Sequence, residues 1–132
     1  MKAIRKALEK RLKAIAPTFE TAFENAAFTP TPGTPYQKVY LLPATPDNQE
    51  KGSTYFERGI FQVTLCYPKD KGPGDAETKA AAIRAAFKKG TSSVEDGVRT
   101  LIILTPRISA GFPDGDRYCI PISITWQSQI ST

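Results

Sequence analysis

The sequence predicts an α+β fold, in which a mostly antiparallel β-sheet carries two main helices, residues 2–15 and 75–89, packed on one face. The first observation is the run GIFQVTLCYP at 59–68, whose period-two pattern puts four apolar side chains on one face of a strand, namely Phe61, Val63, Leu65 and Tyr67. The second is the alanine-rich run after it, which is apolar on one side at helical spacing. Because each element must bury its apolar side, we expect the 132 residues to form one domain, 1–132.

The first helix is predicted by an apolar stripe that ends before Pro17. The stripe consists of Ile4, Leu8, Leu12 and Ile15, with Ala7 and Ala14 beside them. Residues 18–28 predict a second, short turn of helix that uses Phe19, Phe23 and Ala27. The run TPTPGTP at 29–35 is expected to be extended, because a residue before proline avoids the helical conformation.

The first strand is predicted at 36–42, and the second begins near Thr54. Between them, residues 43–53 are polar and punctuated by proline, which is typical of an exposed loop. In the second helix, Asp75 is expected to be the N-cap and Gly90 to follow the last turn. The inward residues of that helix are expected to be Ala76, Ala80, Ile83 and Phe87.

The C-terminal part of the chain predicts further strands. Asp96-Gly97 is a strong hairpin signal between 91–95 and 98–104, and a brief segment at 107–110 follows. The last strand, 117–127, alternates so that Tyr118, Ile120, Ile122, Ile124 and Trp126 share one face. Pro121 faces the other way, and because proline has no N–H to donate, it should lie at a sheet edge or at a bulge.

The formal net charge of +5 is concentrated in the first helix. Residues 1–13 contain six lysines and arginines against one glutamate, whereas the remainder contains 12 basic and 12 acidic side chains. This pattern favours a surface helix docked on the sheet over a basic binding face spread across the domain. The charges leave no apolar core for a secretion signal, and no run of about 18 apolar residues exists, so we expect a cytosolic chain with no membrane partner.

Chemical motifs are sparse. Cys66 and Cys119 lie in strand-like runs and are expected to be reduced and partly buried, with a disulfide as the alternative. With two cysteines and no histidine, zinc sites and histidine-dependent triads are excluded or very improbable, and a Ser-Lys pair is the nucleophilic arrangement left open. The loop 69–78 lacks the Gly-Lys-Ser/Thr of a phosphate-binding loop. We therefore expect no enzyme activity, metal or cofactor.

Five runs together resemble one family in order and spacing. They are PYQKVYLLPATP at 35–46, GIFQVTLCYPKDKGPG at 59–74, AETKAAAIRAAFKKGT at 76–91, DGVRTLI at 96–102 and DRYCIPISITWQ at 116–127. In these runs the chain is similar to the tail-terminator-like proteins of long-tailed bacteriophages and prophages, over about residues 1–128. The resemblance implies a structural protein of the virion that forms a ring of six subunits on the last layer of the tail tube, stops tube growth and offers the head connector a docking surface. It also implies assembly in the host cytoplasm, followed by a place in the virion tail.

A ring built from head-to-tail contacts needs two different patches on each subunit. Our candidate patches are the loops 43–56 and 68–75 and the predicted edge strand with Pro121; the named interface residues are Asp47, Glu50, Lys51, Asp70, Lys71, Asp75 and Pro121. DNA passes through such a ring only as cargo, and Lys6, Lys10 and Lys13 are the candidates for lining its channel. The alternatives are a head–tail connector or minor tail component on a similar fold, and a small nucleic-acid-binding module.

Overall fold

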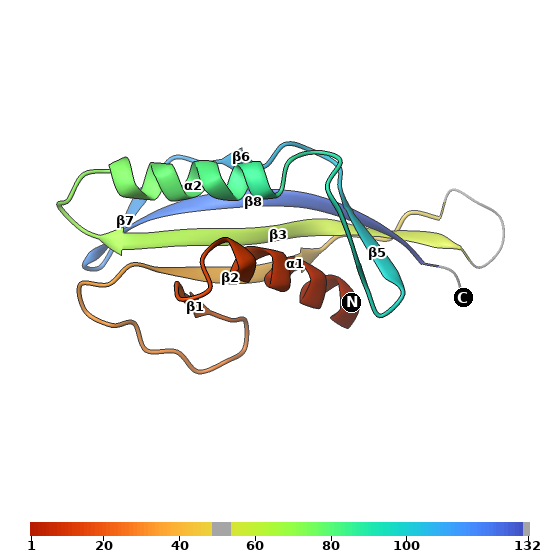
Figure 1. The fold of residues 1–132 in the computed structure, drawn as a ribbon, viewed down its shortest axis with the longest axis horizontal. Helices are drawn as coiled ribbons and strands as arrows, with labels where there is room; N and C mark the ends of the chain where they lie inside the picture. The colour runs from red at the N-terminus through yellow and green to blue at the C-terminus, as the bar shows by residue number, and fades with distance from the viewer. Residues whose placement is uncertain (49–53, 131–132) are drawn as a thin grey trace.

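The computed structural model describes residues 1–48 and 54–130. The elements follow one another as α1 (Lys2–Ile15), β1 (Glu20–Ala22), β2 (Tyr36–Pro43), β3 (Tyr55–Pro68), α2 (Gly74–Ala86), β4 (Ser92–Glu95), β5 (Val98–Ile102), β6 (Arg107–Ile108), β7 (Phe112–Asp114) and β8 (Arg117–Ile130). Both helices lie along the same side of the curled sheet, which confirms the predicted α+β class (Figure 1). Within the described ranges, neither helix is long and apolar enough to cross a membrane.

Two long strands form the backbone of the sheet. β3 and β8 have 14 residues each and pair antiparallel over their whole length, from Tyr55 opposite Ile130 to Pro68 opposite Arg117. At about 3.3 Å per residue, they give the molecule a long axis of roughly 45 Å. The strand order is β1-β2-β3-β8-β5-β4. β6 and β7 pair with β8 on the same side as β5, but nearer to the first residue of β8. Of these pairings only β1 with β2 is parallel.

The core lies between the helices and one face of this sheet. The face contributes Phe61, Val63 and Leu65 from β3 and Ile122, Ile124 and Trp126 from β8, all fully buried. The helices contribute Ile4, Leu8 and Leu12 from α1 and Ala80, Ile83 and Phe87 from α2. The period-two and helical patterns thus correctly predicted the inward residues, with the exception of Ala14, which is exposed.

The helix predicted at 18–28 is wrong. Glu20–Ala22 instead forms β1, which pairs in parallel with Tyr36–Lys38 of β2. Phe19 packs against the core, and its ring centroid is 6.2 Å from that of Tyr67. A weak local preference for helix is overridden here by an available strand edge and an apolar contact.

The ends of α2 also differ from the prediction. Its N-cap is Pro73 and no side chain caps it, so Asp75 lies within the first turn, where its charge still interacts favourably with the helix dipole. The helix ends at Ala86 rather than at 89, and the N–H of Phe87 makes the closing bond to the carbonyl of Ile83 at 3.0 Å.

Pro121 does not lie on an edge strand. β8 is the most widely paired strand of the described sheet, with β3 on one side and β5, β6 and β7 on the other. The carbonyl of Pro121 accepts a hydrogen bond from the N–H of Ser109 at 2.9 Å. The nitrogen of Pro121, which has no hydrogen to donate, is therefore on the side of β8 that faces the stretch between β6 and β7. There three residues, 109–111, stand opposite two, 120–121, because the register shifts by one between the two short strands. Pro121 therefore lies opposite a bulge, which was the other predicted environment.

Candidate subunit-contact surface

The lysines of α1 lie beside the acidic β4–β5 hairpin. Lys6 Nζ is 3.5 Å from Glu95 Oε1 and 3.8 Å from Asp96 Oδ1, and Lys10 Nζ is 3.7 Å from Glu95 Oε2. Lys13 is exposed in the last turn of the helix. The charge of the candidate DNA-facing lysines is therefore offset in part by carboxylates of the same chain, although pairs this exposed are weak.

Arg11 of α1 covers the outer edge of β4. The N–H of Ile102 bonds to the carbonyl of Thr91 at 2.8 Å, so the next carbonyl, that of Ser92, points away from β5. Arg11 Nη2 donates to that carbonyl at 3.3 Å and to Ser93 Oγ at 3.1 Å. A carbonyl that a further strand would use for pairing is thus already occupied.

β1 pairs with β2 only as far as Lys38, and beyond that residue a side chain occupies the outer edge of β2. There the N–H of Leu41 donates to Glu24 Oε1 at 2.9 Å, and Arg5 Nη1 of α1 donates to the same oxygen at 2.9 Å. Pro43, the last residue of β2, has no N–H at all. The hydrogen bond from Leu41, and then the one from Arg5, lower the pKa of Glu24 below its ordinary value of 4.5, against a small opposing effect of burial.

The edge beyond β8 is short and interrupted. Arg84 Nε of α2 donates to the carbonyl of Pro106, just before β6, at 3.1 Å, and Pro113 in β7 offers no N–H. With Arg11 on β4 and Glu24 on β2, three exposed sheet margins carry the devices that hinder edge-to-edge pairing. Contact between copies of this chain by strand addition is therefore disfavoured, which leaves loops and faces.

Glu24→Gln should test the blocked β2 edge. An uncharged amide oxygen accepts the hydrogen bonds from Arg5 and from the Leu41 N–H less strongly than a carboxylate does. We therefore expect the unfolding free energy at pH 7 to fall, but only by about 1 kcal/mol, because the site is partly exposed to solvent. Since the folded-state pKa is below 4.5, the contribution is complete above that pH and is lost as the pH falls through the folded value. Urea unfolding at pH 7 and pH 3 measures it.

The control is Glu57→Gln in β3, a half-buried carboxylate away from any helix terminus and without an ion pair to another described residue, which should change stability little at either pH. A loss in Glu24→Gln that is as large at pH 3 as at pH 7 would contradict the assigned role of the carboxylate.

The described parts of the candidate contact loops lie at opposite ends of the long axis (Figure 1). Asp47 stands at one end, where its backbone exchanges two hydrogen bonds of 2.9 Å with Phe56. Asp70, Lys71 and Asp75 are exposed at the other end, around the entry to α2. Two further candidates, Glu50 and Lys51, fall outside the described residues, and Pro121 is in the interior strand β8 rather than in either end loop.

The sheet face opposite the helices, which we call the open face, exposes an apolar cluster. Leu42 of β2 stands directly opposite Ile60 of β3, and Tyr40 is two residues away on the same face. These side chains are 46%, 36% and 41% exposed. This cluster was not among the predicted contact residues, although the alternation Tyr36-Lys38-Tyr40-Leu42 along the strand was the signal that could have indicated it.

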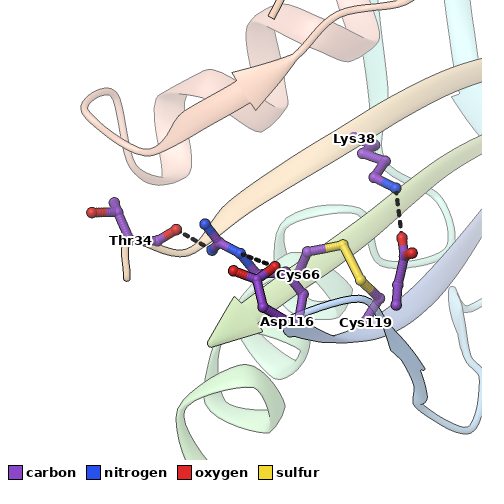
Figure 2. The surroundings of a disulfide bond; sticks show 7 residues. Thr34, Lys38, Cys66, Asp116 and Cys119 are labelled. Atoms are coloured by element: carbon purple, nitrogen blue, oxygen red, sulfur yellow. Dashed lines mark hydrogen bonds and ion pairs between the residues drawn. A yellow bond between two sulfur atoms is a disulfide. The ribbon is translucent and has the colours of Figure 1, made fainter. Parts of the chain in front are cut away.

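The expectation of reduced cysteines is wrong. Cys66 of β3 and Cys119 of β8 are joined by a disulfide on the open face, with their Cα atoms 4.1 Å apart (Figure 2). They are direct cross-strand partners, which brings two side chains of one face close enough to bond. Since the two runs are 53 residues apart, local sequence could not show that they pair.

Residues 23–35, which we call the arm, cover the disulfide. Phe28 of the arm packs on Tyr36, with ring centroids 5.3 Å apart, and so lies against the buried cluster that Tyr36 forms with the two cysteines. Arg117, with only 5% exposure, donates to the carbonyls of Thr31 and Thr34, the former at 2.8 Å. Its guanidinium also lies 5.2 Å from the centre of the Tyr36 ring. One end of the open face is therefore closed by the arm.

Lys38 borders this covered region. Its ammonium donates to Asp114 Oδ2 at 3.2 Å (Figure 2). Burial opposes the charge of Lys38, but the hydrogen bond to Asp114 and the neighbouring tyrosines outweigh it, so the pKa is raised above 10.5. A cation that stays charged at neutral pH thus holds the β7 turn to β2.

The comparisons with known proteins agree with this architecture. Residues 3–126 match a family described as phage tail terminator protein. The chain therefore belongs to the phage tail terminator family, a family of structural proteins, and is a phage structural tail protein. The fold and the match define this class, and together they confirm the resemblance stated from the sequence.

Two solved structures share the fold. One, known by a sequence identifier alone, is 28% identical, with a TM-score of 0.78, 99% of this chain covered and 96% of that one. The other is a chain from the virion of a native gene transfer agent particle, with 16% identity, a TM-score of 0.62 and the same coverage of 99% and 96%. No curated protein matches this chain.

Proposed function

We propose that this protein is the terminator of a phage tail, which caps the last layer of the tail tube and offers the head connector a docking surface. The match of residues 3–126 to the tail terminator family carries the proposal. Its partners are further copies of itself, the tube protein and the head–tail connector. Assembly takes place in the host cytoplasm, with residues 1–132 acting as one unit.

The positions of the candidate loops support head-to-tail contact between subunits, and the number of six rests on the family resemblance alone. A contact of this kind needs two different patches that face away from each other, and the described parts of 43–56 and 68–75 lie at opposite ends of β3 (Figure 1). The blocked sheet margins favour loops over strand pairing as the contact. We assign Asp47, Glu50 and Lys51 to one patch and Asp70, Lys71 and Asp75 to the other. Pro121 is assigned to neither.

Tube length tests the capping function. Co-expression of this chain with the tube protein should shorten the tubes seen by electron microscopy and place a ring at one end. Asp70→Lys combined with Asp75→Lys should restore long, uncapped tubes, because both charges at one patch are reversed. The matched control, Ala81→Lys with Ala85→Lys, adds two lysines to the exposed side of the same helix and should leave capping intact. Tubes of equal length with and without the wild-type chain would contradict the proposal.

The lysines of α1 are proposed to face the DNA that passes through the ring. Lys6→Gln, Lys10→Gln and Lys13→Gln together should lower the salt concentration at which the assembled ring releases duplex DNA, because each phosphate contact contributes to the salt dependence. Lys88→Gln with Lys89→Gln is the control. An unchanged release point in the triple variant would assign the lysines to solvent.

A further inference from the structure

The cysteine pair is bonded yet closed off from solvent. Cys66 and Cys119 both have 0% exposure, although they lie on the face of the sheet that the helices leave bare. Tyr36 is buried with them, Ala22 and Phe28 of the arm pack against this cluster, and Phe112 of β7 is the cross-strand neighbour of Cys119. A small oxidant or reductant can reach a sulfur only if this cover opens, because thiol–disulfide exchange requires direct attack on a sulfur atom.

The arm is held in a way that allows it to open without unfolding the sheet. It lies between β1 and β2, and it contains no helix or strand. Ten of its thirteen residues, 23–27 and 29–33, are exposed. Its attachments are Arg117 to Thr31 and Thr34, the Phe28–Tyr36 ring contact, Thr31 Oγ1 to Glu20 Oε1 at 3.2 Å and the Glu24 contacts described above. Segments with few buried apolar contacts open at a lower free energy than the strands of the core.

The sheet beneath the arm is the opposite case. The two sulfurs lie toward one end of the β3–β8 ladder, with two residue pairs, Tyr67–Tyr118 and Pro68–Arg117, between the bond and that end and the rest of the ladder on its other side. Separation of the strands at the bond would break the ladder there and expose buried residues such as Leu65, whereas lifting the arm would leave the ladder intact. The two routes therefore have different energetic signatures.

We propose that the arm gates thiol–disulfide exchange at Cys66–Cys119, so that the bond is made and broken while the arm is lifted and is sheltered once Arg117 and Phe28 hold the arm down.

In the oxidising direction, one cysteine thiolate attacks a low-molecular-weight disulfide and expels one small thiolate. The second cysteine thiolate then attacks the mixed disulfide, forms the Cys66–Cys119 bond and expels the other. Two protein thiols are oxidised, one small disulfide is reduced to two thiols, and the two protons lost by the cysteines pass to the small thiolates. This gate does not depend on the ring.

The test follows reduction of the purified full-length protein by dithiothreitol, with samples quenched by N-ethylmaleimide and alkylated cysteines counted by intact mass. Phe28→Ala removes the arm side chain that packs against the cysteine cluster and should speed reduction at least about fivefold. The matched control, Phe23→Ala, truncates another aromatic residue of the same arm that is 39% exposed and outside the cysteine cluster, and its rate should stay within about twofold of wild type.

Urea separates the gate from global unfolding. If the arm opens locally, the reduction rate should rise only shallowly with urea below the unfolding transition, and hydrogen exchange should be faster in 23–35 than in β8. Arg117→Lys keeps the charge but cannot donate to both the Thr31 and the Thr34 carbonyl as the guanidinium does, so reduction of the disulfide should be accelerated in this variant as well. Equal rates in wild type, Phe28→Ala and Phe23→Ala, a urea dependence as steep as that of global unfolding, or alkylation of both cysteines before any reductant is added would each overturn the proposal.

Discussion

Removal of the disulfide, by Cys66→Ala with Cys119→Ala, should lower the unfolding free energy by about 2–4 kcal/mol. The bond closes a loop across a separation of 53 residues, for which the chain-entropy estimate is about 4 kcal/mol, and native-state effects usually reduce the measured value. The loss arises mainly because the unfolded chain without the bond gains freedom. Urea unfolding of the oxidised protein and of the double variant measures it.

Reduced wild-type protein is the control for the volume of the two side chains. It keeps both sulfur atoms but has no cross-link, so it should lose nearly as much stability as the double alanine variant. If reduction costs little while the double variant loses the full amount, the stabilisation comes from packing of the buried sulfurs rather than from the bond.

The long amphipathic elements could be predicted from the sequence because their patterns need no knowledge of a partner. α1 was predicted with its observed bounds, and the inward residues of α2 were all correct, since a stripe at helical spacing has one way to be buried. The hairpin at Asp96-Gly97 was likewise correct, because the turn chemistry is local.

The errors in strand pairing and in the state of the cysteines share one physical cause, which is that the deciding partner is distant in the chain. β1 exists because β2 offers an edge to pair with, and the disulfide exists because β3 and β8 are neighbours in register. For Pro121 the choice between an edge and a bulge stayed open, because an isolated strand cannot reveal that its missing donor faces a bulge in another segment. None of these partners can be identified by periodicity alone.

The candidate contact surface was predictable only in part for the same reason. The loops 43–56 and 68–75 follow from composition, but their separation to opposite ends depends on the length of β3. The blocked margins could not be foreseen at all, because Arg11, Glu24 and Arg84 each reach a strand far away in sequence. Together they hinder edge pairing at three margins of the described sheet, and β1, at the remaining edge, is only three residues long.

Arg117→Met should lower the unfolding free energy by about 2–3 kcal/mol, because methionine fills much of the space over Tyr36 but leaves the carbonyls of Thr31 and Thr34 without their donor. We expect a loss of stability near the lower end of the range for removal of a buried charged group, because the exposed arm can lift and let water reach both carbonyls. Urea unfolding gives the free energy, and hydrogen exchange in residues 23–35 should be faster in the variant than in wild type.

Lys38→Met is the matched control: it removes another cation of the open face, but its ion pair with Asp114 is partly exposed and should contribute less than about 1 kcal/mol. Equal losses in the two variants would mean that Arg117 acts as one more surface charge, and that the arm is held by its other attachments, the Phe28–Tyr36 contact and the hydrogen bonds of Thr31 and Glu24.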